Sequence, residues 1–238
     1  MPVSFDNAVV LITGANGGLG EEFVAQALAR GARTVYATAR TPRDWGDPRV
    51  VPLALDVTSE ESIAVAAAAA HDTTIVVNNA GIASRGENSL LTSPQATIRR
   101  LFETNFFGAV NVVRGFAPVL EANGGGALID VHSVLSWVAI SGIYSATKAA
   151  FWSATNSLRL ELAPQGTQVL GLHLGYTATP MTDGIDAPMG TASDVVRDAY
   201  DGLVRGDLEV LADQVSVDVK AGLSGPIEAL YPQFAPTA

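Results

Sequence analysis

The chain has 238 residues, of which 24 are acidic and 14 basic, giving a formal net charge of −10. This charge excludes nucleic acid and anionic membrane surfaces as expected partners, because an acidic surface attracts neither of them. The absence of cysteine excludes disulfides and thiolate metal sites, and with no signal-peptide pattern or membrane-length apolar run it predicts a protein of the cytoplasm.

Short apolar runs rich in β-branched residues alternate with longer Ala- and Leu-rich stretches along the chain. We predict strands over residues 8–13, 34–39, 50–55, 74–78, 127–131, 168–174 and 209–212. We predict helices over residues 18–29, 60–70, 94–122, 144–163 and 192–205. Strands that are apolar throughout and separated by helices indicate a parallel sheet covered on both faces. The sequence therefore predicts a single doubly wound α/β domain over residues 1–238.

Polar residues and glycines collect directly after the predicted strands. They include a glycine cluster at 14–20, then Ala39-Arg40, Asp56-Val57, the run 78–81, and Ser133. In an open parallel sheet, ligands bind at the edge where the carboxyl ends of the strands meet. We therefore expect one binding site at this edge.

The first of these clusters reads Thr-Gly-Ala-Asn-Gly-Gly-Leu-Gly over residues 13–20. It follows a predicted strand and opens a predicted helix, where backbone N–H groups can approach a pyrophosphate. Two glycines in a strand-to-helix turn are common, so the glycines alone are weak evidence of a binding site. The position of the cluster between the first strand and the helix is what supports nucleotide binding. It predicts a dinucleotide site.

The end of the second predicted strand decides which dinucleotide is expected. NAD is typically held there by an acid on the ribose 2′-hydroxyl, but this chain carries Arg40 instead. A guanidinium suits a 2′-phosphate through charge and paired hydrogen bonds. We therefore expect NADP(H), with NAD(H) as the alternative, and Arg33 and Arg43 as substitutes for Arg40.

Tyr144 and Lys148 are four residues apart in a predicted helix, so they lie one turn apart on one face. A fixed ammonium beside a phenol favours the phenolate and lowers the pKa of the phenol. Tyr and Lys also occur at this spacing by chance in many helices. The pair therefore indicates catalysis only together with the other motifs of the chain.

These motifs, taken in order, resemble the short-chain dehydrogenase/reductase family in its form of roughly 250 residues. The residues that carry the resemblance are 13–20, Asn-Asn-Ala-Gly at 78–81, Asn105, Ser133 and Tyr144 with Lys148. The resemblance implies a Rossmann-like sheet of seven parallel strands, a nicotinamide cofactor and hydride transfer between that cofactor and a carbonyl/alcohol pair. It also implies a homo-oligomer, a dimer or a tetramer.

The resemblance implies a catalytic set of Asn105, Ser133, Tyr144 and Lys148. Tyr144 would be the general acid in reduction and the base in oxidation, and Lys148 would lower its pKa. Ser133 would bind the substrate oxygen, and Asn105 would hold a water linking Lys148 to solvent. The cofactor-binding set comprises Gly14, Asn16, Gly18, Leu19, Gly20, Arg40, Asp56, Val57, Asn79, Ala80, Gly81, Tyr144, Lys148, Thr177 and Thr179.

Some positions have alternative interpretations. Asp56 is also suited to capping the helix that follows it, and Ser136 competes with Ser133 as the catalytic hydroxyl. His132 is expected to be a packed strand residue, and no acid/His set has metal-ligand spacing.

We expect the substrate pocket to include Ser136, Trp137, Tyr176 and Met181, with residues 182–191 as a short lid. These residue types favour a hydrophobic ketone or aldehyde over a charged sugar phosphate.

The chain continues beyond the last predicted strand as an extension over residues 213–238, after a core of about residues 7–212. Its apolar positions predict that it docks on the body, at a subunit interface or as one wall of the active site. These positions are Val217, Val219, Leu223, Ile227, Leu230 and Phe234.

The sequence thus predicts an NADP(H)-dependent ketone or aldehyde reductase, or alcohol dehydrogenase, acting on a small molecule. A non-catalytic NADP-binding regulator is the alternative, although such a protein has no need for all of Ser133, Tyr144 and Lys148. An epimerase or dehydratase normally needs a separate substrate domain, for which this chain has no room.

Overall fold

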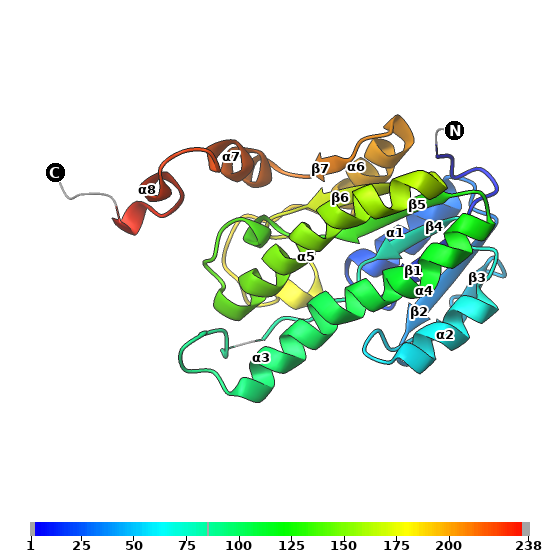
Figure 1. The fold of residues 1–238 in the computed structure, drawn as a ribbon, viewed down its shortest axis with the longest axis horizontal. Coiled ribbons are helices and arrows are strands. Elements are labelled where there is room, and N and C mark those ends of the chain that lie inside the picture. Colours follow the sequence, from blue (N-terminus) through cyan, green and yellow to red (C-terminus); the bar gives the residue numbers. More distant parts are fainter. Residues whose placement is uncertain (1–2, 85, 235–238) are drawn as a thin grey trace.

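Seven parallel strands form one sheet in the order β3-β2-β1-β4-β5-β6-β7 (Figure 1). The computed structural model describes residues 3–84 and 86–234. The first two residues of the predicted domain and the last four of its predicted extension lie outside the described residues. The order reverses between β1 and β4, which creates the crevice where such sheets bind ligands.

The predicted strands are confirmed, with each end within one residue of the expected position. They are β1 Val9–Thr13, β2 Thr34–Ala39, β3 Val50–Ala54, β4 Ile75–Asn78, β5 Gly126–Val131, β6 Thr167–His173 and β7 Glu209–Leu211. The central strands β1 and β4 are buried along their whole length, which explains why they are apolar throughout.

Helices cover both faces of the sheet, with α1 and α6 packed together on one face and α2, α4 and α5 on the other (Figure 1). Their bounds are α1 Leu19–Ala29, α2 Glu60–Ala69, α3 Gln95–Phe102, α4 Ala109–Ala122, α5 Gly142–Leu162, α6 Ala192–Arg205, α7 Gln214–Gly222 and α8 Ile227–Leu230. None of the helices within the described residues is long and apolar enough to cross a bilayer.

Alternate residues of β1 supply the two hydrophobic cores. Val10 and Ile12 pack in the core beneath α1 and α6, whereas Leu11 packs in the core beneath α2 and α4. Side chains alternate between the faces of a strand, so one strand serves both layers. This double burial matches the place of β1 in the interior of the sheet, between β2 and β4.

The predicted continuous helix over residues 94–122 is interrupted, and that prediction is wrong in detail. A π-helical segment, Glu103–Gly108, separates α3 from α4. At its C-terminal end, a Cβ on Gly108 would lie 2.8 Å from Cγ2 of the buried Val57. π-Segments within helices are frequent at functional sites, and this one carries Asn105.

The C-terminal extension forms α7 and α8, which reach away from the layered body at the left of Figure 1. Asp213 caps α7 by accepting a hydrogen bond from the Ser216 N–H at 2.7 Å. The Tyr231 hydroxyl accepts a hydrogen bond from the Ala139 N–H at 2.8 Å, which joins the extension to the loop after β5. The predicted docking is therefore present along the side that faces this loop.

The two faces of the extension differ. Val219 and Leu230 line a cavity described below. The other predicted apolar positions are exposed: Val217, Leu223, Ile227 and Phe234.

A Gly→Ala substitution within a helix usually stabilises a protein, but the tight packing at Gly108 predicts the opposite effect. Gly108→Ala adds helix propensity of about 1 kcal/mol, but the new methyl group must displace Val57. We expect the free energy of unfolding, measured by urea titration, to fall by about 1–3 kcal/mol. Gly190→Ala is the control, since its Cβ would meet nothing nearer than the Tyr176 carbonyl oxygen at 4.0 Å. A Gly108→Ala protein as stable as the parent would contradict the tight packing.

Candidate active site

A cavity of about 840 Å³ opens at the edge of the sheet where the strands end. Its lining brings together the glycine cluster, residues 79–81 after β4, the loop after β5, the first turns of α5 and the segment after β6. These segments are far apart in the sequence. The structure thus brings to one cavity most of the strand-end segments that the sequence singles out.

Two glycines shape the turn between β1 and α1. Gly18 has φ 58°, a conformation that favours glycine, and a Cβ there would lie 3.3 Å from Cβ of Thr179. A Cβ on Gly20 would lie 2.2 Å from the Gly14 carbonyl oxygen. The turn is therefore tight, and the N-terminus of α1 is left accessible to an anionic group.

Asn79 holds the glycine turn against the end of β4. Its Nδ2 donates hydrogen bonds to the carbonyl oxygens of Thr13 and Gly14 at 2.9 and 3.2 Å. The Thr13 hydroxyl oxygen in turn accepts hydrogen bonds from the N–H groups of Asn79 and Ala80 at 2.9 and 3.0 Å. The polar residues after β4 therefore support the turn, while Ala80 and Gly81 line the cavity.

Arg40 is exposed after the end of β2, and no hydrogen bond or ion pair holds its guanidinium within the part of the chain that the structure describes. The two predicted substitutes are already paired, Arg33 with Asp72 at 3.1 Å and Arg43 with Glu21 at 2.8 Å. Nearby, Asn16 ties the glycine turn to this segment, since its Nδ2 donates to the Thr41 carbonyl oxygen at 2.7 Å. Arg40 is thus the free cation of the three.

Asp56 follows β3 but does not cap α2. Its carboxylate accepts hydrogen bonds from the N–H and hydroxyl groups of Thr58 at 2.9 and 2.7 Å, and these bonds lower its pKa. The cap of α2 is Ser59, whose Oγ accepts from the Ser62 N–H. Asp56 and Val57 do not line the cavity, and neither do Asn16, Gly20 and Arg40.

Ser133, Tyr144 and Lys148 line the cavity together. Ser133 lies two residues beyond the end of β5, and its hydroxyl lies 3.4 Å from the Leu174 carbonyl oxygen. Tyr144 and Lys148 lie in the first two turns of α5, and the Lys148 Nζ donates to the Val131 carbonyl oxygen at 2.9 Å. The predicted helix and the predicted juxtaposition are both present.

The pKa of Tyr144 differs from the expectation. Burial raises the pKa of this phenol to about 12, instead of Lys148 lowering it. Burial also lowers the pKa of Lys148 to about 8, against the opposing pull of Asp130. The Lys148 ammonium lies 5.8 Å from the centre of the Tyr144 ring and is engaged by Val131. Desolvation therefore outweighs the charge effect, and the phenol remains a proton donor at neutral pH.

Asn105 is buried and fastens the segment after β4 to α5. Its Oδ1 accepts from the Ile82 N–H at 2.8 Å, while its Nδ2 donates to the Ile82 carbonyl oxygen at 2.9 Å and to the Thr147 hydroxyl at 3.2 Å. A Cβ on Gly81 would lie 3.5 Å from the Asn105 Oδ1 and 3.9 Å from the Lys148 Nζ. Asn105 therefore lies close behind the cavity floor without lining it.

The predicted pocket residues divide into two pairs. Tyr176 and Met181 line the cavity, but Ser136 and Trp137 do not. The Trp137 ring stacks on His173 with ring centres 4.0 Å apart, which turns it away from the cavity. Nothing in the sequence indicated this orientation, because His173 is distant from Trp137 in the chain and becomes its neighbour only in the folded protein.

His132 and His173 are buried on neighbouring strands, with ring centres 4.9 Å apart. Burial lowers the pKa of His132 well below its usual value and that of His173 to about 3, so both rings are neutral. His132 therefore acts as a packed residue, in line with the sequence interpretation. Within the described residues no group of three or more His, Cys, Asp or Glu side chains could hold a metal ion.

The segment after β6 covers one side of the cavity. A backbone bridge pairs Thr177 with Gly190, which closes the base of the predicted lid. The buried Thr177 Oγ1 has no hydrogen-bond partner in the described structure, while Thr179 lies against Gly18. A polar group in this corner would satisfy the Thr177 hydroxyl.

Sequence reasoning missed Ser84 and Asn88, which line the cavity from the segment after β4. The one feature of the sequence that could have indicated these two residues is their position in the segment that follows β4. It also missed Asp130 of β5, which is fully buried and accepts hydrogen bonds from the Thr155 hydroxyl at 2.6 Å and the Asn78 Nδ2 at 3.3 Å. Burial raises the pKa of Asp130 to about 6.

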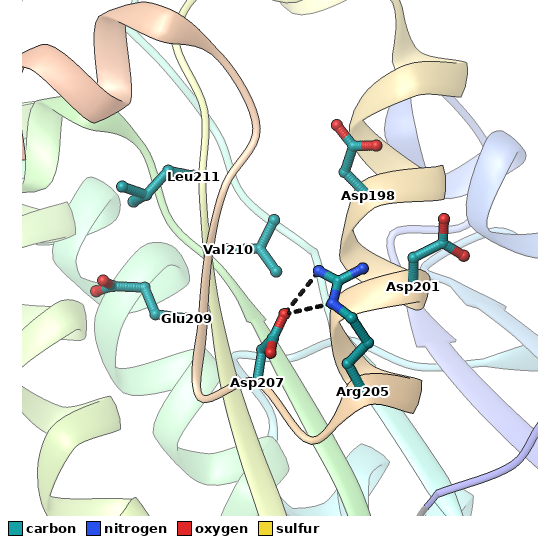
Figure 2. Close-up of a pocket in the computed structure, with 7 residues that line it drawn as sticks. All are labelled: Asp198, Asp201, Arg205, Asp207, Glu209, Val210 and Leu211. Atoms are coloured by element: carbon teal, nitrogen blue, oxygen red, sulfur yellow. Dashed lines mark hydrogen bonds and ion pairs between the residues drawn. The ribbon is translucent and has the colours of Figure 1, made fainter.

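Figure 2 shows a second hollow, of about 290 Å³, between α6 and β7. Asp198 and Asp201 line it from α6, and the Arg205 guanidinium donates to the Asp207 Oδ2 at 3.0 and 2.6 Å. The charges of Arg205 and Asp207 neutralise each other. None of the predicted site residues lines this hollow. This hollow therefore carries no candidate chemistry.

The family model of the short chain dehydrogenases matches residues 8–190. A galactitol 2-dehydrogenase (L-tagatose-forming) of Cereibacter sphaeroides is 32% identical over 190 residues, which is 74% of this chain and 74% of the relative. A crystal structure of a short chain dehydrogenase from Burkholderia cenocepacia J2315 in complex with NADP has a TM-score of 0.91 and 33% identity, covering 98% of this chain and 100% of that one. A short-chain dehydrogenase from Sphingobium yanoikuyae in complex with NADPH has a TM-score of 0.80 and 25% identity, covering 97% and 98%.

The buried Asp130 generates a prediction about pH and stability. Its pKa is about 6 in the folded protein, against an ordinary value of 3.8, so the folded state binds more protons between these values. The cost of the buried charge therefore grows as pH rises through this window and is fully present above pH 6. Asp130→Asn removes the charge, and we expect it to raise the free energy of unfolding by about 2–3 kcal/mol more at pH 8 than at pH 4.

Urea unfolding at the two pH values measures this difference. Asp218→Asn on the exposed surface of α7 is the control, with the same change of charge and no burial. An equal effect of Asp130→Asn at both pH values would contradict the buried-charge interpretation.

Proposed function

The chain belongs to the short-chain dehydrogenase family, and from this premise we propose that it is an NADP(H)-dependent oxidoreductase acting on a carbonyl/alcohol pair. In the direction of reduction its substrate is a ketone or an aldehyde. The observation that carries the proposal is that Ser133, Tyr144 and Lys148 line one cavity together with the glycine turn. Non-catalytic binding of a dinucleotide does not require that combination.

Three features of this chain fit NADP(H). The tight turn before α1 leaves helix N–H groups accessible to a pyrophosphate. Arg40 is free of hydrogen bonds and ion pairs among the described residues, so its guanidinium is available to a 2′-phosphate. The buried Thr177 hydroxyl has no hydrogen-bond partner among the residues that the structure describes, which suits a polar group such as a carboxamide. The structural relatives from Burkholderia and Sphingobium contain NADP and NADPH, and NAD(H) remains the weaker alternative.

The nicotinamide, when bound, supplies the hydride in reduction and accepts it in oxidation. The Ser133 hydroxyl donates a hydrogen bond to the substrate oxygen and stabilises charge that develops there. The Tyr144 phenol gives its proton to the same oxygen in reduction and takes it back in oxidation. Because the pKa of Tyr144 is raised to about 12, the phenol is fully protonated at neutral pH and ready for reduction.

Lys148 and Asn105 act around the reacting group. The Lys148 ammonium, held at the Val131 carbonyl, orients a ribose hydroxyl and favours the phenolate after the proton has left. The side-chain amide oxygen and nitrogen of Asn105 are both hydrogen-bonded, to Ile82 and Thr147. Asn105 therefore fixes the floor of the cavity beneath Lys148. Its remaining acceptor lone pair is available to a water on the path to solvent.

We also propose that the enzyme is a homo-oligomer, a dimer or a tetramer, in the cytoplasm. Phe107 and Leu160 are exposed by 49% and 78%, and large exposed apolar side chains favour burial against another chain. The mass of the purified protein by light scattering measures the oligomeric state, and a monomer would contradict this assignment.

The role of Tyr144 is tested by Tyr144→Phe, which removes the hydroxyl and keeps the ring. Loss of a proton donor should lower kcat about 10²–10⁴-fold, with the Kd of NADPH unchanged within about threefold. Steady-state NADPH oxidation with a panel of ketones and aldehydes measures kcat, and fluorescence titration measures Kd. Tyr176→Phe is the matched control, because Tyr176 also lines the cavity but has no assigned proton transfer. Full activity of Tyr144→Phe would remove the proton-transfer role.

The preference for NADP(H) is tested by Arg40→Ala. Loss of a charge-assisted contact to the 2′-phosphate should raise the Kd of NADPH roughly 10–100-fold and leave that of NADH within about twofold. Arg43→Ala is the matched control, since Arg43 is paired with Glu21. Equal weakening of both dinucleotides would mean that Arg40 does not contact the phosphate. Binding of neither dinucleotide to the parent protein would refute the proposed function itself.

A further inference from the structure

The part of the cavity beyond Ser133 and Tyr144 has apolar walls. The loop after β5 contributes Val138 and Ile140, and the segment after β6 contributes Met181 and Ile185. Met181 and Ile185 are 45% and 39% exposed, so the described residues leave much of their apolar surface uncovered. A substrate with an apolar body would cover it.

The third wall comes from the C-terminal extension. Val219 of α7 and Leu230 of α8 line the same cavity, and both are half-buried. Val217, two residues before Val219 on the same helix, is 40% exposed and does not line the cavity. Residues two apart point to different sides of a helix, so one face of α7 serves the cavity and the other faces outward.

The C-terminal extension is fastened to the body of the protein at several points. Lys220 of α7 forms an ion pair with Glu209 of β7 and lies 5.6 Å from the centre of the Trp137 ring. Asp213 accepts a hydrogen bond from the Gly175 N–H, at the end of β6. The Tyr231 hydroxyl binds the Ala139 N–H on the other side. Because α7 and α8 are tied to segments that also line the cavity, their apolar side chains have fixed positions.

The described residues that line the cavity offer a far-end anion no free cation. Of the described residues that line it, Lys148 is the sole Lys or Arg, and its ammonium is bound by the Val131 carbonyl. Asp183 in the lid is the sole carboxylate among them. A substrate carboxylate or phosphate at the far end would lose its hydration without gaining a cation, and Asp183 would repel it.

We propose that the substrate is an uncharged ketone, or the corresponding alcohol, with a long apolar body that reaches α7 and α8. Val219 and Leu230 determine this specificity by contacting the end of the body far from the reacting carbon. The inference rests on the proposed carbonyl/alcohol chemistry and adds the substrate class and the residues that select it.

A series of methyl ketones from 2-butanone to 2-dodecanone tests the class, with NADPH oxidation as the readout. Each methylene that enters the apolar wall is expected to raise kcat/KM about threefold until the wall is covered. A keto acid of the same length, with a carboxylate at the far end, is expected to react at least about tenfold more slowly than the ketone. A flat series, or a preference for the keto acid, would overturn the inference.

Two substitutions on α7 test the wall itself. Val219→Trp fills the far end of the cavity and should lower kcat/KM for 2-dodecanone by about tenfold or more, with 2-butanone within about threefold. Val217→Trp places the same side chain on the outward face and should change neither. Leu230→Ala is a second wall variant in case Val219→Trp fails to fold, and it should lower kcat/KM for the long ketone about three- to tenfold with little effect on the short one. Equal loss for long and short ketones in the wall variants would overturn the assignment.

The substrate class and the oxidoreductase activity are tested separately by these experiments. Turnover of ketones without any dependence on length removes the substrate class and leaves the oxidoreductase proposal intact. Absence of turnover with every carbonyl compound removes the oxidoreductase proposal and this inference with it.

Discussion

The parallel pairing of all seven strands is the constraint on which the rest of the molecule depends. It brings the carboxyl end of every strand to one edge of the sheet. The segments that follow β1, β4, β5 and β6 therefore meet at one cavity. Hydrogen bonds between the ends of neighbouring strands then lock this edge, as between Asn79 and the Thr13 and Gly14 carbonyls. Lys148 adds a tie from α5 to the last residue of β5. The cavity is therefore a direct product of sheet topology.

Burial governs the electrostatics at this edge. Tyr144, Lys148 and Asp130 all have pKa values displaced toward their neutral forms, because each is withdrawn from water. The phenol is consequently held as an acid and the lysine is only moderately basic. The far end of the cavity is apolar as well, because Val219 and Leu230 line it. The proposed proton donation by Tyr144 and the proposed preference for an uncharged substrate would thus have the same physical origin, which is burial.

Local patterns predicted what depends on local geometry. The spacing of Tyr144 and Lys148 was sufficient to place both on one face of α5, and the cluster over residues 13–20 was sufficient to predict the turn before α1. The interruption of the long helix by the π-helical segment was not predictable from local sequence. A side chain at Gly108 would collide with Val57, which lies in the turn between β3 and α2 and becomes its neighbour only in the fold. Trp137 was misplaced for a similar reason, since its position depends on stacking with His173.

The sequence by itself determined the parallel α/β class, the strand positions, the family resemblance and the residues that collect at the strand ends. Each of these follows from periodicity or from short motifs, in which neighbours along the chain are also neighbours in space. The tertiary structure alone decided that Tyr144 is a weaker acid than its lysine neighbour suggested. It also decided that, among the described residues, Arg40 has no ion-pair partner whereas Arg33 and Arg43 each have one. It also decided which face of α7 lines the cavity. These features depend on burial and on partners distant in the chain, which no local pattern of residues encodes.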